Sequence, residues 1–244
     1  MNFIQTPKIV SFCLAVLGFI ACDVCADVVI SGTRIIYPAQ AKEITVKLDN
    51  RGEKALLVQS WLDDGREDVN PQEMKIPFLV TPPISRMNAK QGQTVKIASL
   101  GGELPKDKET VFWFNVLEIP PKAKNSTDEN LLQLAFRTRI KLFYRPEGLK
   151  GSASEAATAL TWKIVKNGQQ VFAEAKNATP YFVTVNEAFL NTNGRKYELE
   201  TKMIAPDSTQ LMKVDGLTTT VNTGKINYTA INDYGGNIKY EASL

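Results

Sequence analysis

Histidine is absent from this chain of 244 residues. Without an imidazole the chain cannot assemble a Ser-His-Asp or Cys-His catalytic group, and metal sites with histidine ligands are excluded. An excess of one charge is also lacking, because 29 Lys and Arg stand against 26 Asp and Glu. The formal net charge of +3 therefore does not indicate a nucleic-acid partner. The motifs GxGxxG and GxSxG are missing as well.

Cysteine occurs only at the start of the chain, where all three copies lie within the first 25 residues. Lys8 precedes an apolar run over 9–20, and small residues follow up to Ala26, which is the pattern of a secretory signal peptide. The run is short for a membrane span of ~20 residues, so a retained anchor is the less favoured alternative. We predict a signal peptide over 1–26, cleaved after Ala26. Cleavage removes every cysteine, so the exported chain would have no disulfide.

Sustained helical periodicity is rare, and strand patterns dominate the rest of the chain. The segment 162–172 reads as a hairpin with Asn167-Gly168 as its two-residue turn. Many short strands between turn dipeptides favour β-sandwiches. The clearest strand patterns, alternating or continuously apolar, are at 44–48, 94–97, 111–117 and 225–231.

A stretch rich in turn formers, 146–153, divides the chain after its longest strand pattern. We predict two domains, residues 27–147 and residues 148–244. Each has about the size of one immunoglobulin-like sandwich, ~100 residues. The predicted fold class is therefore all-β, with two immunoglobulin-like β-sandwich domains.

The longest strand pattern, 131–144, runs without Gly or Pro, whereas strands usually span about five or six residues. Apolar side chains alternate along one face and polar side chains along the other. One interpretation is a half-buried strand with its apolar face in the core. The other is an exposed sheet edge that pairs with a strand of another chain. Periodicity alone does not choose between them.

Six motifs in a fixed order span both predicted domains and carry a resemblance to a known family. These six motifs are GTRIIYP (32–38), TPP (81–83) with Arg86, FNVLEIPP (114–121), IKLFYRP (140–146), TPYFVTV (179–185) and INDYGG (231–236). With these motifs in this order, the chain resembles the periplasmic pilus-assembly chaperones, the PapD-like family. The short, polar segment 122–130 resembles the short-loop branch of that family.

The resemblance implies a boomerang of two domains with a cleft between them, and a binding protein rather than an enzyme. Such a chaperone binds, folds and caps pilus subunits in the periplasm by donor-strand complementation, and delivers them to an outer-membrane usher. No cofactor, metal, ATP or nucleic acid is expected, and a P-loop motif is missing. The sequence leaves open whether the free chaperone dimerises through its exposed edges.

Two groups of binding residues follow from the resemblance. Arg34 and Lys141 match the family's pair of cations that anchor the C-terminal carboxylate of a pilus subunit, by charge-assisted hydrogen bonds. Leu132, Leu134 and Phe136 match the apolar side chains of the donor strand. On pattern alone, Arg34 and Lys141 would be interpreted as solvated surface charges.

A third group of charges is expected to set the angle between the domains. Glu118, Arg145 and Asp233 correspond by the resemblance to an interdomain salt-bridge cluster. Without it they would be interpreted as unrelated surface charges, since exposed ion pairs contribute only ~0–1 kcal/mol.

Two other classes of function compete with the chaperone. A structural fimbrial subunit or a two-domain adhesin is the alternative, but a pilin is typically one domain with a disulfide. The acidic segment 63–68 could suggest a carboxylate-dependent hydrolase or a calcium site, yet it lacks EF-hand spacing and reads better as a hairpin turn.

Overall fold

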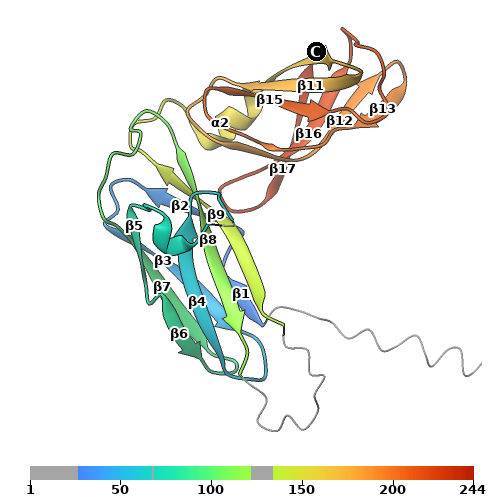
Figure 1. The fold of residues 1–244 in the computed structure, drawn as a ribbon. Coiled ribbons are helices and arrows are strands. Elements are labelled where there is room, and N and C mark those ends of the chain that lie inside the picture. The colour runs from blue at the N-terminus through green and yellow to red at the C-terminus, as the bar shows by residue number, and fades with distance from the viewer. Residues whose placement is uncertain (1–26, 68, 122–133) are drawn as a thin grey trace, which may run out of the picture.

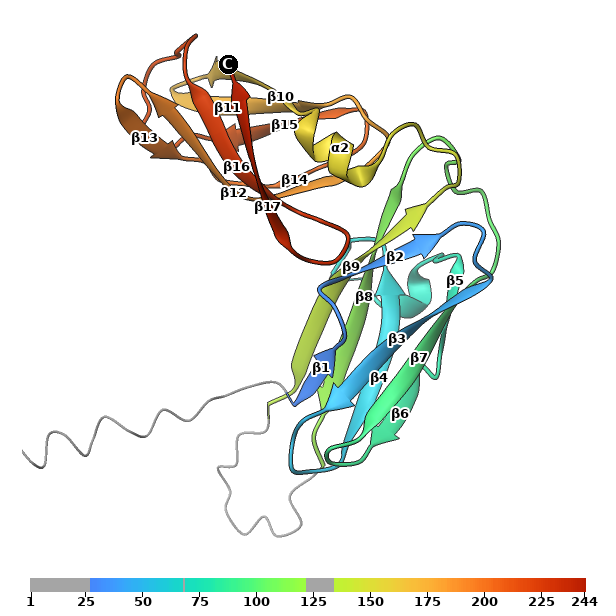
Figure 2. The same cartoon turned by 180° about the vertical axis from the view of Figure 1, so that it is seen from behind.

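The computed structural model of the protein describes residues 27–67, 69–121 and 134–244. These residues form mostly β-strands, arranged in two β-sandwich domains (Figure 1). The domains meet at an angle, which gives the chain a boomerang shape, and the view from behind shows the same bend (Figure 2). The predicted all-β class with two immunoglobulin-like domains is confirmed.

The first domain contains a sheet of order β1-β3-β7-β5 and a sheet of order β2-β9-β8-β4-β6. Strands such as β3 alternate buried and exposed residues: Val46 and Leu48 are buried while Thr45 and Lys47 are exposed. The strands are β1 (Val28–Ile30), β2 (Arg34–Pro38), β3 (Glu43–Asn50), β4 (Leu56–Asp63), β5 (Phe78–Thr81), β6 (Ile84–Met87), β7 (Gly92–Ser99), β8 (Thr110–Ile119) and β9 (Phe136–Arg145).

The second domain contains a sheet of order β10-β11-β15 and a sheet of order β13-β12-β16-β17, with β14 also paired to β12. The antiparallel β12–β16 pair is central to the larger sheet. The strands are β10 (Thr161–Asn167), β11 (Gln170–Asn177), β12 (Val183–Thr192), β13 (Arg195–Glu198), β14 (Met203–Ile204), β15 (Ser208–Lys213), β16 (Lys225–Ile231) and β17 (Asn237–Ser243).

Helices are short in the described residues. The 3-10 turn η2 (Pro71–Glu73) follows β4, and α2 (Ala153–Thr158) opens the second domain. The hydroxyl of Ser152 accepts a hydrogen bond from the Glu155 amide, which caps the start of α2. No helix within these described ranges is long and apolar enough to cross a membrane.

Each domain buries its own set of apolar side chains. The buried cluster of the first domain runs from Val28 to Leu142, and that of the second from Ala156 to Ala230. Burying one large apolar side chain contributes roughly 1.5–3 kcal/mol. Because each cluster contains residues of one domain only, the angle between the domains depends on contacts other than a shared core.

Two predicted elements differ in detail from the structure. The hairpin expected over 162–172 is formed by β10 and β11, but Asn167 pairs with Gln170. The two turn residues are therefore Gly168 and Gln169 rather than Asn167 and Gly168. Gly168 has a φ of 61°, which suits the first position of such a turn.

The long strand expected over 131–144 is displaced toward the C-terminus. β9 spans Phe136–Arg145, and residues 131–133 lie outside the described residues. The first residue of β9 pairs with Glu118 near the end of β8. β8 ends at Ile119, directly before Pro120 and Pro121, which have no N–H to donate to a ladder.

Candidate functional site

Arg34 and Lys141 lie side by side in the structure. β2 pairs in parallel with β9, and the register places Arg34 opposite Lys141. Both side chains are half-buried. Arg34 Nη1 donates a hydrogen bond to the Ile231 carbonyl at 2.9 Å, and its guanidinium lies 5.6 Å from the ring of Phe143. Lys141 Nζ lies 5.2 Å from the ring of Trp113, its partner on β8.

Neither cation forms an ion pair with a carboxylate among the described residues. Burial lowers the pKa of Lys141, and the neighbouring positive charge of Arg34 lowers it further. Burial also lowers the pKa of Arg34, against the opposing effect of Asp233 and Glu109. The buried Nε of Arg34 has no hydrogen-bond partner in the described residues. An anion placed between the two cations would stabilise both charged forms.

The strand β9 has a free edge that leads to these cations. β8 pairs with β9 from Phe136 to Tyr144, whereas β2 pairs only with residues 141–145. On the β2 side, residues 136–140 of β9 therefore have no strand partner among the described residues. Such an edge presents backbone donors and acceptors to an incoming strand.

The expected donor-strand residues are placed only in part. Leu132 lies outside the described residues. Leu134 precedes β9, and 52% of its surface is exposed. Phe136, the first residue of β9, is half-buried. The two described side chains are thus apolar, accessible and next to the free edge.

Arg145 joins the two domains through two carboxylates. Its Nε donates to Glu109 Oε1 at 2.6 Å, and its Nη1 and Nη2 donate to the two oxygens of Asp233 at 2.7 and 2.9 Å. Burial alone lowers the pKa of Arg145, but the bonds to Asp233 and Glu109 raise it above the ordinary value. The guanidinium is therefore held charged between β9 and the loop after β16.

Glu118 does not belong to this cluster, contrary to expectation. It lies at the other end of β8, where it pairs with Phe136 and accepts a hydrogen bond from the Asp27 amide at 3.0 Å. Glu109, which precedes β8, takes the expected place. Sequence reasoning missed Glu109 because it follows other charged residues, and nothing in its spacing marks it as buried. The expected carboxylate, Glu118, thus lies at the end of β8 opposite to the one that contacts the second domain.

Glu109 also fastens the second domain directly. Its Oε2 accepts a hydrogen bond from the Phe182 amide at 2.7 Å, and its own amide donates to the Pro180 carbonyl at 2.9 Å. The rings of Phe143 and Phe182 lie 5.7 Å apart across the junction. Polar and aromatic contacts therefore hold the angle between the domains.

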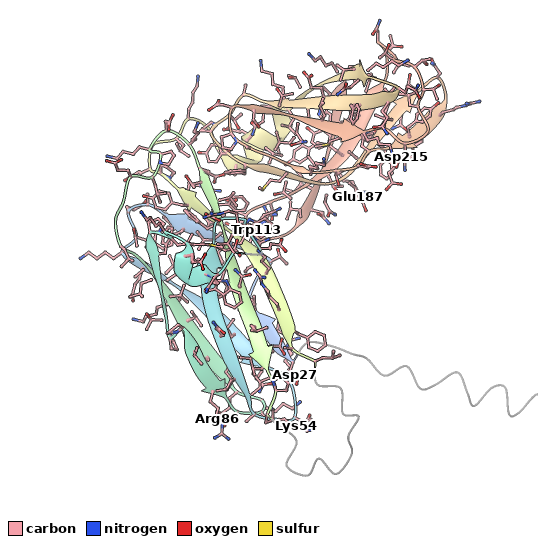
Figure 3. All side chains as sticks on the ribbon, viewed as in Figure 1. Asp27, Lys54, Arg86, Trp113, Glu187 and Asp215 are labelled. Carbon is pink, nitrogen blue, oxygen red and sulfur yellow. The ribbon has the colours of Figure 1, made fainter. Side chains whose placement is uncertain are left out.

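A cleft of about 370 Å³ lies at the junction. Arg34, Phe143 and Arg145 line it from the first domain, and Tyr181 and Tyr234 from the second. Lys141 does not line this cleft itself but stands next to Arg34. Figure 3 shows Trp113, the residue under Lys141, at the end of the first domain that faces the second.

A second network fixes the arginines of β9, and sequence reasoning missed it as well. Asp63 is fully buried and pairs with Arg139 at 2.5 Å and Arg137 at 3.3 Å. Asn115 donates to Asp63 at 2.7 Å. Burial alone would raise the pKa of Asp63, but hydrogen bonds from Arg139, Asn115 and Gly65 lower it. Asp64 and Gly65 form a bend after β4 and not the expected hairpin turn, because the next strand, β5, pairs with β7 instead of β4.

The fold and the cleft define a two-domain chaperone, and comparisons with known proteins agree. Residues 27–150 match the family model of the pili and flagellar-assembly chaperone PapD N-terminal domain. Residues 155–242 match the pili assembly chaperone PapD C-terminal domain. The chain belongs to this family of pilus-assembly chaperones.

Individual relatives cover nearly the whole chain. The probable fimbrial chaperone YadV of Escherichia coli K12 is 46% identical, over 99% of this chain and 100% of that protein. Chaperone protein FimB/FhaD of Bordetella pertussis is 40% identical, over 94% of this chain and 93% of its own length. The crystal structure of YadV has a TM-score of 0.79 at 49% identity, covering 90% of this chain and all of that one.

A structure of Salmonella enterica SafA pilin in complex with the SafB chaperone is also similar, with a TM-score of 0.74 at 27% identity. It covers 90% of this chain and 97% of that chain. These relatives are named as chaperones, and they do not favour the alternative of a fimbrial subunit or adhesin.

Proposed function

We propose that this chaperone captures a pilus subunit by adding a strand of the subunit to the free edge of β9. The observation that carries the proposal is the register that ends this edge at Arg34 and Lys141. A C-terminal carboxylate placed there receives charge-assisted hydrogen bonds from two cations that have no carboxylate partner in the described chain.

The register also predicts the direction of the captured strand. β9 runs from Phe136 toward Arg145, and the cations stand where its pairing with β2 begins. A strand that lies along 136–140 and ends at the cations therefore runs parallel to β9. The fixed carboxylate sets the alignment, since a slip of one residue would turn every side chain to the opposite face.

In this arrangement Leu132, Leu134 and Phe136 supply apolar side chains to the groove of a subunit that lacks its own final strand. The exposure of Leu134 supports this role. The bonds of Arg145 to Glu109 and Asp233 hold the cleft at a fixed angle while the subunit is bound. The energy comes from binding, so the reaction needs no ATP.

Location and delivery complete the proposal. The signal peptide over 1–26 would direct the chain to the periplasm, with cleavage after Ala26. The boundary between domains at residues 147 and 148 is supported by the two separate buried clusters. Subunits would then pass to an outer-membrane usher, and no enzymatic step is part of this function.

The proposal is tested by purifying the tagged chain from the periplasm of its native host and identifying the bound proteins by mass spectrometry. Lys141→Ala is expected to lose its subunits while remaining folded. The matched control is Lys96→Ala, an exposed lysine of β7 that pairs with Glu43. The proposal fails if wild type carries no subunits while the pilus genes are expressed, or if Lys141→Ala retains them.

A further inference from the structure

Glu118 is a buried carboxyl group that forms no ion pair with any of the described residues. Only 3% of its surface is exposed. Its Oε2 accepts the hydrogen bond from the Asp27 nitrogen at 3.0 Å, but its Oε1 is buried and has no hydrogen-bond partner in the described residues. The charged residue that shifts its pKa is Asp27, and no lysine or arginine of the described residues is among the causes of that shift. A carboxylate in such a place is destabilising unless a cation reaches it.

The surroundings of Glu118 oppose its negative charge. Burial raises the pKa of Glu118, and the nearby backbone amides of Val28 and Asp27 lower it only in part. The side chain of Asp27 adds a second negative charge nearby, which raises the pKa again. A positive group at the Asp27 nitrogen, which already donates to Oε2, would offset both effects.

Backbone and packing contacts fix the position of Asp27 beside the Glu118 carboxyl group. The Arg51 amide donates to the Asp27 carbonyl at 2.7 Å, and Val28 then begins β1 opposite Asn50. A Cβ atom on Gly52 would lie 2.3 Å from Asp27 Cγ, so glycine leaves the space that the Asp27 carboxyl fills. Figure 3 shows Asp27 at the end of the first domain that lies away from the second domain.

We propose that Glu118 is a binding site for a primary ammonium group, and that its ligand is the α-amino group of Asp27. This inference rests on the cleavage after Ala26 proposed above. Before cleavage the Asp27 nitrogen is a neutral amide with one N–H. Hydrolysis adds water across the Ala26–Asp27 bond, leaving a carboxylate on the leader and an ammonium with three N–H donors on Asp27. One donor keeps its bond to Oε2, and the others are available to Oε1.

The consequence is that removal of the leader stabilises the fold. In the uncut chain, only one oxygen of Glu118 has a hydrogen-bond donor among the described residues, whereas in the cut chain Glu118 forms an ion pair with the Asp27 ammonium. Because Glu118 pairs with Phe136, the new ion pair forms next to the start of the donor strand. Stability is thus added to the first domain only after export.

The test uses the mature chain with three defined N-termini: a free Asp27, an Nα-acetylated Asp27, and an added alanine before Asp27. Each is made with Glu118, with Glu118→Gln, and with the control Glu103→Gln, an exposed glutamate. Urea unfolding gives the equilibrium constant of each form. These N-termini are defined chemically, so the result does not depend on subunit capture or on where export cleaves the chain.

With Glu118 present, the free Asp27 form is expected to have an unfolding constant about tenfold lower than the acetylated form, a size typical of one hydrogen bond to a charged group. Glu118→Gln should shrink this difference to less than about twofold, and Glu103→Gln should leave it unchanged. The α-amino pKa, measured by NMR, should lie above its usual value of about 7.7–8.0 only when Glu118 is present. Equal stability of all three N-termini, or a difference that survives Glu118→Gln, would overturn the inference.

Discussion

One face of β9 carries four cations that are of two kinds. Arg137 and Arg139 pair with Asp63, and Arg145 pairs with Glu109 and Asp233. Lys141, in the same row, has no carboxylate partner in the described residues, and burial together with Arg34 lowers its pKa. The paired cations link parts of this protein to one another, whereas the proposed function assigns Lys141 to a charge that a partner supplies.

The largest effect is expected from removing the unpaired cation. Lys141→Met should weaken subunit binding about 1,000-fold, the size expected when one member of a desolvated charge pair is lost. The free energy of unfolding should not fall, because the side chain makes no ion pair in the described chain. Calorimetric titration and urea unfolding measure the two quantities separately. A variant that loses stability and binding together would erase the distinction between the two kinds of cation.

Removing Arg145, the paired cation at the junction, should instead lower the stability of the fold. Arg145→Met leaves Glu109 buried without its partner, and the expected cost is about 3 kcal/mol in the free energy of unfolding. The domains should also adopt a wider range of angles, which small-angle X-ray scattering detects. The matched control is Lys213→Met on β15, whose ion pairs are exposed. An unchanged scattering profile with unchanged stability would show that the junction is held by other contacts.

The Asp63 network provides a test within β9. Asp63→Asn keeps the shape of the side chain but removes the charge that Arg137 and Arg139 share, so a loss of about 2 kcal/mol is expected. Amide hydrogen exchange should speed up along Phe136–Arg145 more than along β7. Uniform exchange throughout the first domain would mean that Asp63 acts on the whole core instead of on this strand.

The smallest expected effect is on the pH dependence of the affinity for a subunit. The pKa of free Lys141 lies below its ordinary value, and a bound carboxylate raises it again. The complex therefore holds a proton that the free protein loses as the pH rises through the lowered pKa. Affinity is full below that pKa and should decline by up to about tenfold per pH unit above it. Lys141→Arg, which stays charged, should bind without this decline, and a flat profile for wild type would contradict the assignment.

Much of the architecture was predictable from the sequence, because alternation and turn residues are local signals. The strand predicted over 225–231 has the same ends as β16. The start of β9 was not predictable from its own pattern, since it depends on where the prolines end β8. The turn after β10 differs by one residue because pairing with β11 decides the register.

In the candidate site, too, some residues were predictable from the sequence and others were not. Arg34 and Lys141 were identified through the motifs of the family, and the structure brings them together across two strands far apart in the chain. Glu118 was assigned to the salt-bridge cluster in place of Glu109, although both lie at ends of β8. Which end of a strand faces the second domain is a property of the tertiary fold, so spacing in the sequence could not decide it.

The most direct test of the central claim uses a synthetic peptide with the C-terminal strand sequence of a captured subunit. The peptide is made with a free carboxylate and with a carboxamide, and each is titrated against wild type and Lys141→Ala. The carboxylate form should bind wild type at least about 100-fold more tightly than the amide form, and Lys141→Ala should remove most of that preference. Equal affinity of wild type for both peptides would contradict the claim that Arg34 and Lys141 anchor a carboxylate.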